Sequence, residues 1–302
     1  MTEQLPVDVR GLVKRFGRTT ALDGLDLRVR RGEVHGFLGP NGSGKTTTLR
    51  VLLGLLRRDA GVARLFGADP RRDAVELHRR LAYVPGDVAL WPELTGGETI
   101  DFLTALRGGV DQARRDSLVD RFALDPTVRG RAYSRGNRQK VALVAALASD
   151  VELLVLDEPS AGLDPIVDAE FRRAIGEERD RGRTVLLSSH VLSEVEALCD
   201  RMTIIHRGRT VESGSLLELR HLTRTTVISE LAGPVPRLDD LTGVHTSQLD
   251  GRRVVCEAEP AAMQELMRRL ASTGIVRLDV RPPTLEQLFL ADIARDTGVE
   301  TS

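Results

Sequence analysis

The sequence is poor in lysine, aromatic residues and cysteine. Lysine occurs only at positions 14, 45 and 140, so arginine supplies the rest of the 43 basic side chains. Aromatic residues make up 3% of the chain and the formal net charge is −1, and both values argue against a nucleic-acid-binding surface. The two cysteines, Cys199 and Cys256, have no metal-binding or redox spacing. They argue against a disulfide framework and a zinc site, and reduced thiols are typical of a cytosolic protein.

Long apolar runs are also missing. The first ten residues, MTEQLPVDVR, contain no apolar segment of the kind that a signal peptide has. Apolar runs such as VALVAALA, at 141–148, are far shorter than the ~18 residues that a membrane-spanning helix needs. If the protein works at a membrane, another chain must therefore cross it.

The first part of the chain has the pattern of an α/β domain, which we place at residues 5–220. The runs 33–39, 151–159 and 183–190 are short, apolar and continuous, as in strands of a parallel sheet that is buried on both faces. Helical spacing at 165–182, between two of these runs, predicts a β–α–β unit. Further elements are expected as follows: antiparallel strands at 7–16 and 21–30, a helix at 46–56, a helical subdomain at about 87–149, and a hairpin at 200–214.

The pattern restarts after residue 220, which predicts a small α+β domain at 221–302. Its expected elements are strands at 225–231, 243–249, 253–259 and 275–280, an amphipathic helix at 261–273, and a last apolar segment at 283–290. Two charged stretches of the chain, RRLAYVP (79–85) and EERDRGR (177–183), are expected to be solvated surface.

Residues 39–46, GPNGSGKT, form a glycine-rich loop between a predicted strand and a predicted helix. They fit the pattern G-x-x-x-x-G-K-[ST], in which backbone amides surround phosphate oxygens at the start of a helix. Lys45 is expected to bind the terminal phosphates, because an ammonium group fits this tight loop better than a planar guanidinium. The Thr46 hydroxyl is expected to bind Mg²⁺. This accounts for one lysine but not for Lys14 or Lys140.

Polar residues end two of the predicted core strands. Asp157 and Glu158 follow the apolar run LLVL, and His190 follows LLSS. The carboxyl ends of parallel strands face the ligand crevice of such sheets. Asp157 therefore suits Mg²⁺ coordination, Glu158 is placed to polarise an attacking water, and His190 is a candidate for the same site.

In combination these motifs resemble the nucleotide-binding subunit of an ATP-binding cassette (ABC) transporter, an α/β P-loop NTPase with an antiparallel β subdomain and a helical subdomain. GPNGSGKTT resembles the Walker A loop, LLVLDEP resembles Walker B, SAGLDP (160–165) resembles the D-loop, and YSRGNRQK (133–140) resembles the LSGGQ signature. The resemblance implies that Glu158 is the catalytic base and His190 the switch histidine. It also implies the following ATP-binding residues: Phe16, which would stack on adenine, Gly39, Pro40, Asn41, Gly42, Ser43, Gly44, Lys45, Thr46, Thr47, Ser134, Gly136 and Asp164.

The resemblance also implies cofactors, partners and a location. ATP and Mg²⁺ would be bound, with Thr46 and Asp157 as metal ligands. The expected partners are a transmembrane permease and a second ATP-binding subunit, most simply another copy, at the cytoplasmic face of the membrane. The appended domain and PTLEQLFL (283–290) resemble the daunorubicin-resistance type of exporter, so the expected function is ATP-driven export of drugs or other hydrophobic small molecules.

The sequence departs from the family pattern in two places. The signature has Tyr133, Arg135 and Asn137 in place of family residues, although Ser134 and Gly136 remain. The family also has a glutamine after Y-x-P that reaches Mg²⁺, and this chain has Gly86 there. Either the neighbouring Asp87 supplies an oxygen to the metal instead, or the contact is absent and water takes its place.

Two other classes of protein compete with this interpretation. A soluble ABC ATPase of translation or DNA repair is the first. Translation types resemble two fused cassettes, whereas this chain has one phosphate loop, and the coiled coils or zinc hooks of repair types are not found in the sequence. A P-loop kinase or GTPase is the second, and the chain has no NKxD-like guanine-binding motif.

Overall fold

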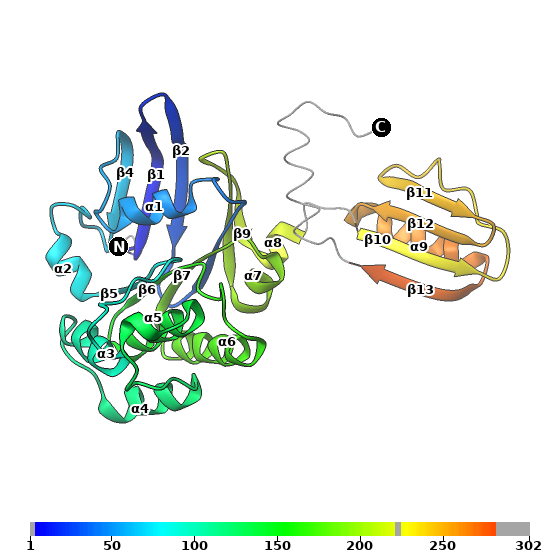
Figure 1. Cartoon of the computed structure of the whole chain (residues 1–302). Coiled ribbons are helices and arrows are strands. Elements are labelled where there is room, and N and C mark those ends of the chain that lie inside the picture. The colour runs from blue at the N-terminus through cyan, green and yellow to red at the C-terminus, as the bar shows by residue number, and fades with distance from the viewer. Residues whose placement is uncertain (1–3, 221–224, 282–302) are drawn as a thin grey trace. The chain divides into compact units, whose positions relative to one another are not determined.

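The computed structural model describes residues 4–220 and 225–281, and the chain divides into two compact units, residues 1–213 and 214–302 (Figure 1). The division falls inside strand β9 (Arg209–Ser215), a few residues before the domain boundary that the sequence pattern places after residue 220. Each unit has its own sheet and its own apolar core.

The first unit is built on a six-stranded sheet in the order β5-β6-β7-β3-β8-β9. Besides β9, its strands are β3 (Val34–Leu38), β5 (Leu81–Val84), β6 (Leu153–Asp157), β7 (Thr184–Ser189) and β8 (Arg201–His206). The pairs β5–β6, β6–β7, β7–β3 and β3–β8 are parallel. Every residue of β3, β6 and β7 is buried. The predicted parallel core and its β–α–β unit are therefore confirmed.

A second sheet of the first unit is antiparallel and has the order β2-β1-β4. Its strands are β1 (Val7–Phe16), β2 (Thr19–Val29) and β4 (Ala60–Leu65). Its buried side chains join one core with the parallel sheet and the first helix, as Val7, Leu27, Phe37 and Leu49 show. The predicted pair of antiparallel strands is confirmed. The third strand was not predicted, because its first three residues are exposed and include Gly61.

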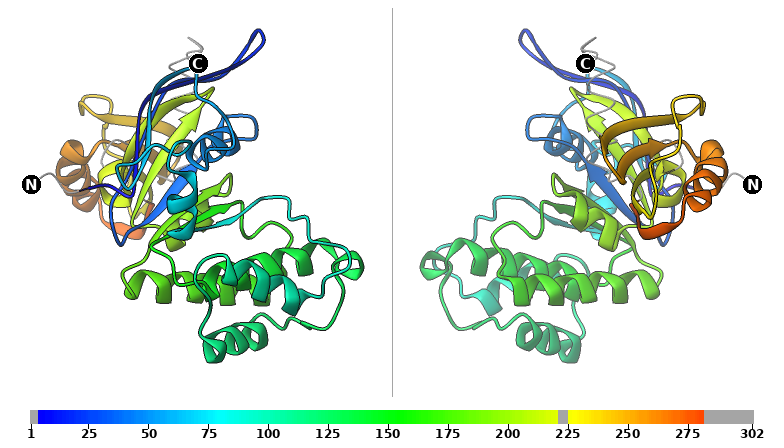
Figure 2. Two further views of the ribbon diagram at one scale, coloured as in Figure 1. Left: turned by 90° about the vertical axis from the view of Figure 1, so that its left-hand side faces the viewer. Right: turned by 90° about the vertical axis from the view of Figure 1, so that its right-hand side faces the viewer.

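Helices cover the parallel sheet of the first unit. They are α1 (Lys45–Leu52), α2 (Ala74–Arg79), α3 (Gly96–Ala105), α4 (Gln112–Arg121), α5 (Arg135–Ala148), α6 (Pro165–Asp180) and α7 (Leu192–Leu198), with a 3-10 turn at Gly130–Ala132. Figures 1 and 2 show α3, α4, α5 and α6 gathered on one side, away from the antiparallel sheet. Helix α1 ends before residue 56 because Gly54 turns the chain, with φ of 73°. None of the helices in the described ranges is long and apolar enough to cross a membrane.

The two stretches predicted to be solvated charge are so only in part: residues 179–182 are exposed as predicted, whereas other residues of both stretches are buried. RRLAYVP contains β5, whose Leu81, Ala82 and Val84 are buried against β6. EERDRGR ends α6, and there Glu178 and Arg183 are only 2% and 8% exposed. In both cases a partner distant in sequence buries the segment, and local charge density gives no sign of that partner.

The second unit is an α+β fold, as predicted. Its sheet has the order β11-β12-β10-β13. The elements are α8 (Leu216–Arg220), β10 (Thr225–Leu231), β11 (Val244–Asp250), β12 (Arg253–Ala258), a 3-10 turn at Pro260–Ala262, α9 (Met263–Ser272) and β13 (Ile275–Arg281). Leu266 and Leu270 of α9 pack on Val227, Val254 and Cys256 of the sheet. The apolar segment expected at 283–290 lies outside the described residues.

Candidate nucleotide site

Residues 39–44 form a loop that leads from β3 into the first turn of α1. Gly44 precedes the helix with φ of 113°, and a Cβ there would lie 2.7 Å from Leu22 Cδ2 and 2.9 Å from Ala21 O. Only glycine fits such a position. Asn41 and Gly42 are exposed at the tip of the loop. The loop therefore presents backbone amides at a helix N-terminus, the arrangement that binds phosphate.

Lys45 is the first residue of α1 and is only 5% exposed. Its Nζ donates hydrogen bonds to Gly39 O at 2.7 Å and Pro40 O at 3.2 Å, and it lies 3.6 Å from Glu158 Oε1. Burial lowers the pKa of Lys45, while the carboxylates of Glu158 and Asp157 oppose that shift. The ammonium group is thus held against the loop, and its contact with the terminal phosphates stays a prediction.

Asp157 ends β6, and both of its carboxylate oxygens accept hydrogen bonds. The Thr46 hydroxyl donates to Oδ2 at 2.9 Å, and the Ser188 hydroxyl donates to Oδ1 at 2.6 Å. Burial and the negative charge of Asp157 raise the pKa of the nearby Tyr83 to about 12. Thr46 and Asp157 together present hard oxygen ligands, which Mg²⁺ prefers.

Glu158 follows Asp157 in a left-handed backbone conformation, with φ of 49°. This conformation is costly for a residue other than glycine. The Glu158 amide donates to both the carbonyl and the hydroxyl oxygen of Ser188, at 3.1 Å each. Its Oε1 lies 3.3 Å from His190 Nδ1. The structure therefore brings Lys45, Glu158 and His190 together at the carboxyl ends of β6 and β7.

The residues of the loop fit a magnesium nucleotide. Ser43 Oγ is buried and has no hydrogen-bond partner within the described ranges, so a hydroxyl remains available to a phosphate oxygen. No group of three or more His, Cys, Asp and Glu side chains in these ranges could hold a metal by itself. A metal ion would therefore bind Thr46 and Asp157 together with phosphate oxygens, as in other P-loop proteins.

Two further residues, one at the end of β1 and one in α1, were also predicted to contact ATP. Phe16, at the end of β1, is 48% exposed, and Lys14 Nζ lies 5.1 Å from the centre of its ring. An exposed ring is what stacking on adenine needs. Thr47 is half-buried in α1. The contacts of both residues with ATP stay predictions.

The signature segment starts α5 and packs on the D-loop segment. Ser134 is the N-cap residue, and its Oγ accepts a hydrogen bond from Asn137 N at 3.3 Å. A Cβ on Gly136 would lie 2.7 Å from Gly162 O, so this contact requires glycine. Gln139 Nε2 donates to Pro159 O at 3.1 Å. Helix α5 and residues 159–162 are therefore in direct contact.

The tyrosine that departs from the signature pattern has a place in the core. Tyr133 is buried, and its hydroxyl donates to the carbonyl oxygen of Asp125. A Cβ on Gly96 would lie 2.2 Å from the Tyr133 hydroxyl. The ring therefore fits because residue 96 has no side chain. Arg135, the first residue of α5, is exposed.

Asp164 caps α6. Its Oδ1 accepts hydrogen bonds from the amides of Val167 at 3.0 Å and Ile166 at 3.1 Å, and the Val167 bond is the main cause of its lowered pKa. Lys140 Nζ lies 3.9 Å from Asp164 Oδ2. These contacts give Asp164 a structural role, and its predicted contact with ATP stays a prediction.

Gly86 lies against Asp157. A Cβ on Gly86 would lie 3.2 Å from Asp157 O, which is closer than ordinary van der Waals contact. The backbone therefore passes directly beside the predicted metal ligand, and Asp87 is the next residue. The predicted metal contact of Asp87 stays a prediction, with water as the alternative occupant.

Sequence analysis missed two residues of the site. Ser188 binds Asp157 and the amide of Glu158, and Gln139 fastens the signature helix to Pro159. Ser188 lies two residues before His190, at the end of a strand predicted to reach the site, and this position was the available signal. The sequence gave no signal for Gln139, because its partner is a backbone carbonyl and any residue type could supply that group.

The fold and these contacts define a P-loop ATPase, and comparison with known proteins gives its family. The family model described as ABC transporter matches residues 22–161. Daunorubicin resistance ATP-binding protein DrrA3 of Streptomyces coeruleorubidus is 40% identical over 94% of both chains. Bacitracin transport ATP-binding protein BcrA of Enterococcus faecalis is 34% identical over 74% of both. A solved structure of an ATP-binding subunit of an ABC transporter has a TM-score of 0.67 at 29% identity, covering 72% of this chain and 92% of its own.

The chain belongs to the ABC transporter family, as one of its ATP-binding subunits. It therefore binds and hydrolyses ATP. ATP-binding subunits of this family dimerise and work with permease partners.

Proposed function

We propose that two copies of this chain, or this chain and a similar one, enclose two ATP molecules and drive a membrane exporter at the cytoplasmic face of the membrane. The observation that carries the proposal is the arrangement of the site: five side chains meet at one edge of the parallel sheet, namely those of Lys45, Thr46, Asp157, Glu158 and His190. Ser134 supports the dimer, because its hydrogen bonds within the described residues reach Asn137 and Arg138, not the phosphate loop.

The residues of the site divide the work of hydrolysis. The loop amides and Lys45 bind and orient the phosphates. Thr46 and Asp157 would hold Mg²⁺, which would supply positive charge against the phosphates. Glu158 accepts the proton of the attacking water, and His190, 3.3 Å from Glu158 Oε1, orients that carboxylate. Ser134 and the amides at the start of α5 bind the terminal phosphate held by the opposite subunit.

A mixing experiment tests the composite site. Subunits with Lys45→Ala and subunits with Ser134→Arg should each be inactive alone, and the two are then combined. In a mixed dimer one site carries both lesions and the other carries neither, so part of the ATPase activity should return. If Ser134 served the ATP of its own subunit, both sites would be damaged and no activity would return.

The first unit has an apolar hollow of about 610 Å³, which is evidence for a permease partner. It lies between the segment after α1, helix α2, strand β5 and helix α3, and its lining includes Leu55, Val75 and Leu106. These three side chains are largely exposed. Exposed apolar surface of this kind marks interaction sites. We assign this hollow to a cytoplasmic segment of the permease. Tyr83, which also lines the hollow, lies close in sequence to Gly86.

The cargo follows from the relatives alone. DrrA3 is described by daunorubicin resistance and BcrA by bacitracin transport, so a hydrophobic drug or antibiotic is the proposed substrate class. The test uses membrane vesicles that contain this chain and a permease that co-purifies with it. ATP should drive uptake of daunorubicin into inverted vesicles, and Lys45→Ala should abolish it. Failure to co-purify with any membrane protein would favour a soluble ABC ATPase not coupled to transport.

A further inference from the structure

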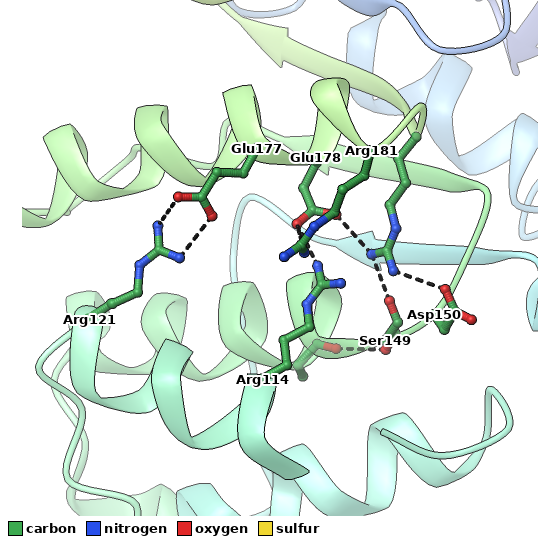
Figure 3. A network of polar contacts seen from close by, with 9 residues as sticks. Arg114, Arg121, Ser149, Asp150, Glu177, Glu178 and Arg181 are labelled. Carbon is green, nitrogen blue, oxygen red and sulfur yellow. Dashed lines mark hydrogen bonds and ion pairs between the residues drawn. The ribbon is translucent and has the colours of Figure 1, made fainter. Parts of the chain in front are cut away.

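A carboxylate near the end of α6 is enclosed by three arginines, one from α4 and two from the short connection between α6 and β7. Glu178 Oε1 lies 2.5 Å from Arg114 Nη2 of α4 and 3.2 Å from Nη1 of Arg181, the C-cap of α6. Glu178 Oε2 lies 2.9 Å from Nη1 of Arg183, just before β7. Figure 3 shows Arg114, Glu178 and Arg181 converging between the helices. We call Arg114, Glu178 and Arg183 the Glu178 clamp.

The clamp reaches the signature helix at its far end. Arg183 Nη1 also donates to Ser149 O at 2.8 Å, and Ser149 is the C-cap of α5. Arg183 Nη2 binds Asp150 Oδ1 at 3.1 Å. One arginine therefore joins α6, the end of α5 and the segment that leads into β6.

A second group of ion pairs joins α4 to α6. Arg121, at the end of α4, forms a bidentate pair with Glu177 at 2.8 and 2.9 Å and also contacts Glu170 at 2.5 Å (Figure 3 shows the pair with Glu177). These groups are more exposed than Glu178, so water screens this pair more strongly. The clamp is the buried part of the α4–α6 contact.

Buried ion pairs seldom stabilise a fold more than apolar packing would, because the charges lose their hydration. They do fix geometry, since each charge must meet its partner. The geometry fixed here is the tilt of α5. This helix has 14 residues and is about 21 Å long, so a tilt of about 5° at its C-terminal end would move Ser134 by about 2 Å. Displacements of that size disable catalytic groups.

We infer that the Glu178 clamp positions the signature helix α5 toward the ATP of the opposite subunit, with Glu178 as a positioning residue remote from the nucleotide. This inference rests on the composite site proposed above. The contacts of Gly136 with Gly162 and of Gln139 with Pro159 hold the start of α5, and the clamp holds its end. The clamp thereby ties α4 and α6 to the end of the signature helix.

The test compares ATP-induced dimerisation in variants that cannot hydrolyse ATP. Glu158→Gln should form an ATP-bound dimer, and the Mg-ATP concentration at half-maximal dimer is measured by light scattering. Adding Arg114→Met, which removes the α4 charge and leaves Glu178 with Arg181 and Arg183, should raise that concentration about tenfold. Arg114→Lys should restore most of the loss. Asp180→Asn, which removes an exposed charge at the end of α6, should leave it unchanged.

A second measurement separates positioning from folding. ADP affinity of the monomer depends on the phosphate loop and should stay within twofold in Arg114→Met. If Glu158→Gln forms no dimer, the composite site fails. If it dimerises at the same ATP concentration with and without Arg114→Met, the clamp alone is refuted. A parallel loss of ADP affinity would assign the effect to general damage and also refute it. If Arg114→Met does not fold, Arg114→Lys becomes the test of the clamp. It should raise the Mg-ATP concentration at half-maximal dimer by about threefold, and no shift would refute the clamp.

Discussion

At the scale of single residues, the three lysines have informative places. Lys45 lies in the phosphate loop, Lys140 lies 3.9 Å from Asp164 of the D-loop, and Lys14 lies 5.1 Å from the ring centre of Phe16. All three therefore neighbour residues predicted to contact ATP. In a chain whose other basic residues are arginines, these three lysine side chains are at most 12% exposed.

Glu158 gives the first prediction. Glu158→Gln removes the base but keeps the size of the side chain, so ATP should still bind while turnover falls by ~100-fold or more. Steady-state ATPase assays and nucleotide titration measure the two effects separately. Normal turnover in this variant would assign the base to another residue.

Asp87 gives the second prediction. If its carboxylate reaches Mg²⁺ in place of the family glutamine, Asp87→Ala should raise the Mg²⁺ concentration for half-maximal ATPase activity several-fold, because hard cations favour charged oxygen ligands. Metal-free nucleotide affinity should change little. Mg²⁺ is titrated at fixed ATP, with the permease present. If the Mg²⁺ titration curves of the two proteins superimpose, Asp87 does not bind the metal and water occupies that position.

At the scale of elements, buried polar contacts fix the strand that leads into the phosphate loop. His35 of β3 makes two contacts: its Nδ1 lies 2.9 Å from Glu33 Oε1, and its Nε2 lies 2.9 Å from Thr203 Oγ1. Thr203 in turn lies 2.9 Å from Ser213 Oγ of β9. The Arg30 amide also donates to Glu33 at 2.8 Å. The start of β3 is therefore joined to β8 and β9.

The pKa of Glu33 leads to a prediction about acid stability. Burial by itself would raise this pKa, but the hydrogen bonds from His35 and the Arg30 amide bring it below its ordinary value of 4.5. A carboxyl whose pKa is lowered by folding stabilises the protein above its unfolded value, and that stabilisation is lost as the pH falls through the folded pKa. Glu33→Gln should therefore be less stable at neutral pH and less sensitive to acid. Thermal midpoints measured from pH 7 to pH 3 check this, and parallel curves for the two proteins would contradict it.

The elements that could be predicted from the sequence are those whose pattern is local. Strands β3, β6 and β7 are continuous apolar runs, and β1 and β2 alternate. Strand β5 has only four residues and arginines before it, and its burial comes from pairing with β6, about 70 residues away. Helices α2 and α7 were likewise not predicted, since six or seven residues are too few for a clear period.

The site was more predictable than its support. The phosphate loop and Asp157, Glu158 and His190 could be named because parallel strands carry their carboxyl ends to one edge. The Glu178 clamp could not, because the direction in which a charged side chain points depends on α4, more than fifty residues earlier in the chain. The same charged run is typical of solvated helix ends.

At the scale of the whole molecule, the ATP site must be linked to a permease. Tyr83 lines the hollow beside α2 and α3, and it belongs to the strand that ends two residues before Gly86. Gly86 lies against Asp157. A permease segment seated in the hollow, as proposed above, would contact the strand that continues toward the predicted metal ligand, and this short path would give the permease a route to sense the nucleotide.

Leu106 is the residue of the hollow best suited to a test, because it is 60% exposed at the end of α3 and its replacement should not disturb the fold. Leu106→Glu places a charge in the apolar hollow, so co-purification with the permease should fall by about tenfold or more. Basal ATPase activity and the thermal midpoint should stay unchanged. Leu249→Glu is the matched control, since Leu249 is 61% exposed on β11 of the second unit, and it should retain the permease. Full retention by Leu106→Glu would move the docking surface elsewhere, and equal loss in both variants would show that apolar exposure in general, not this hollow, holds the permease.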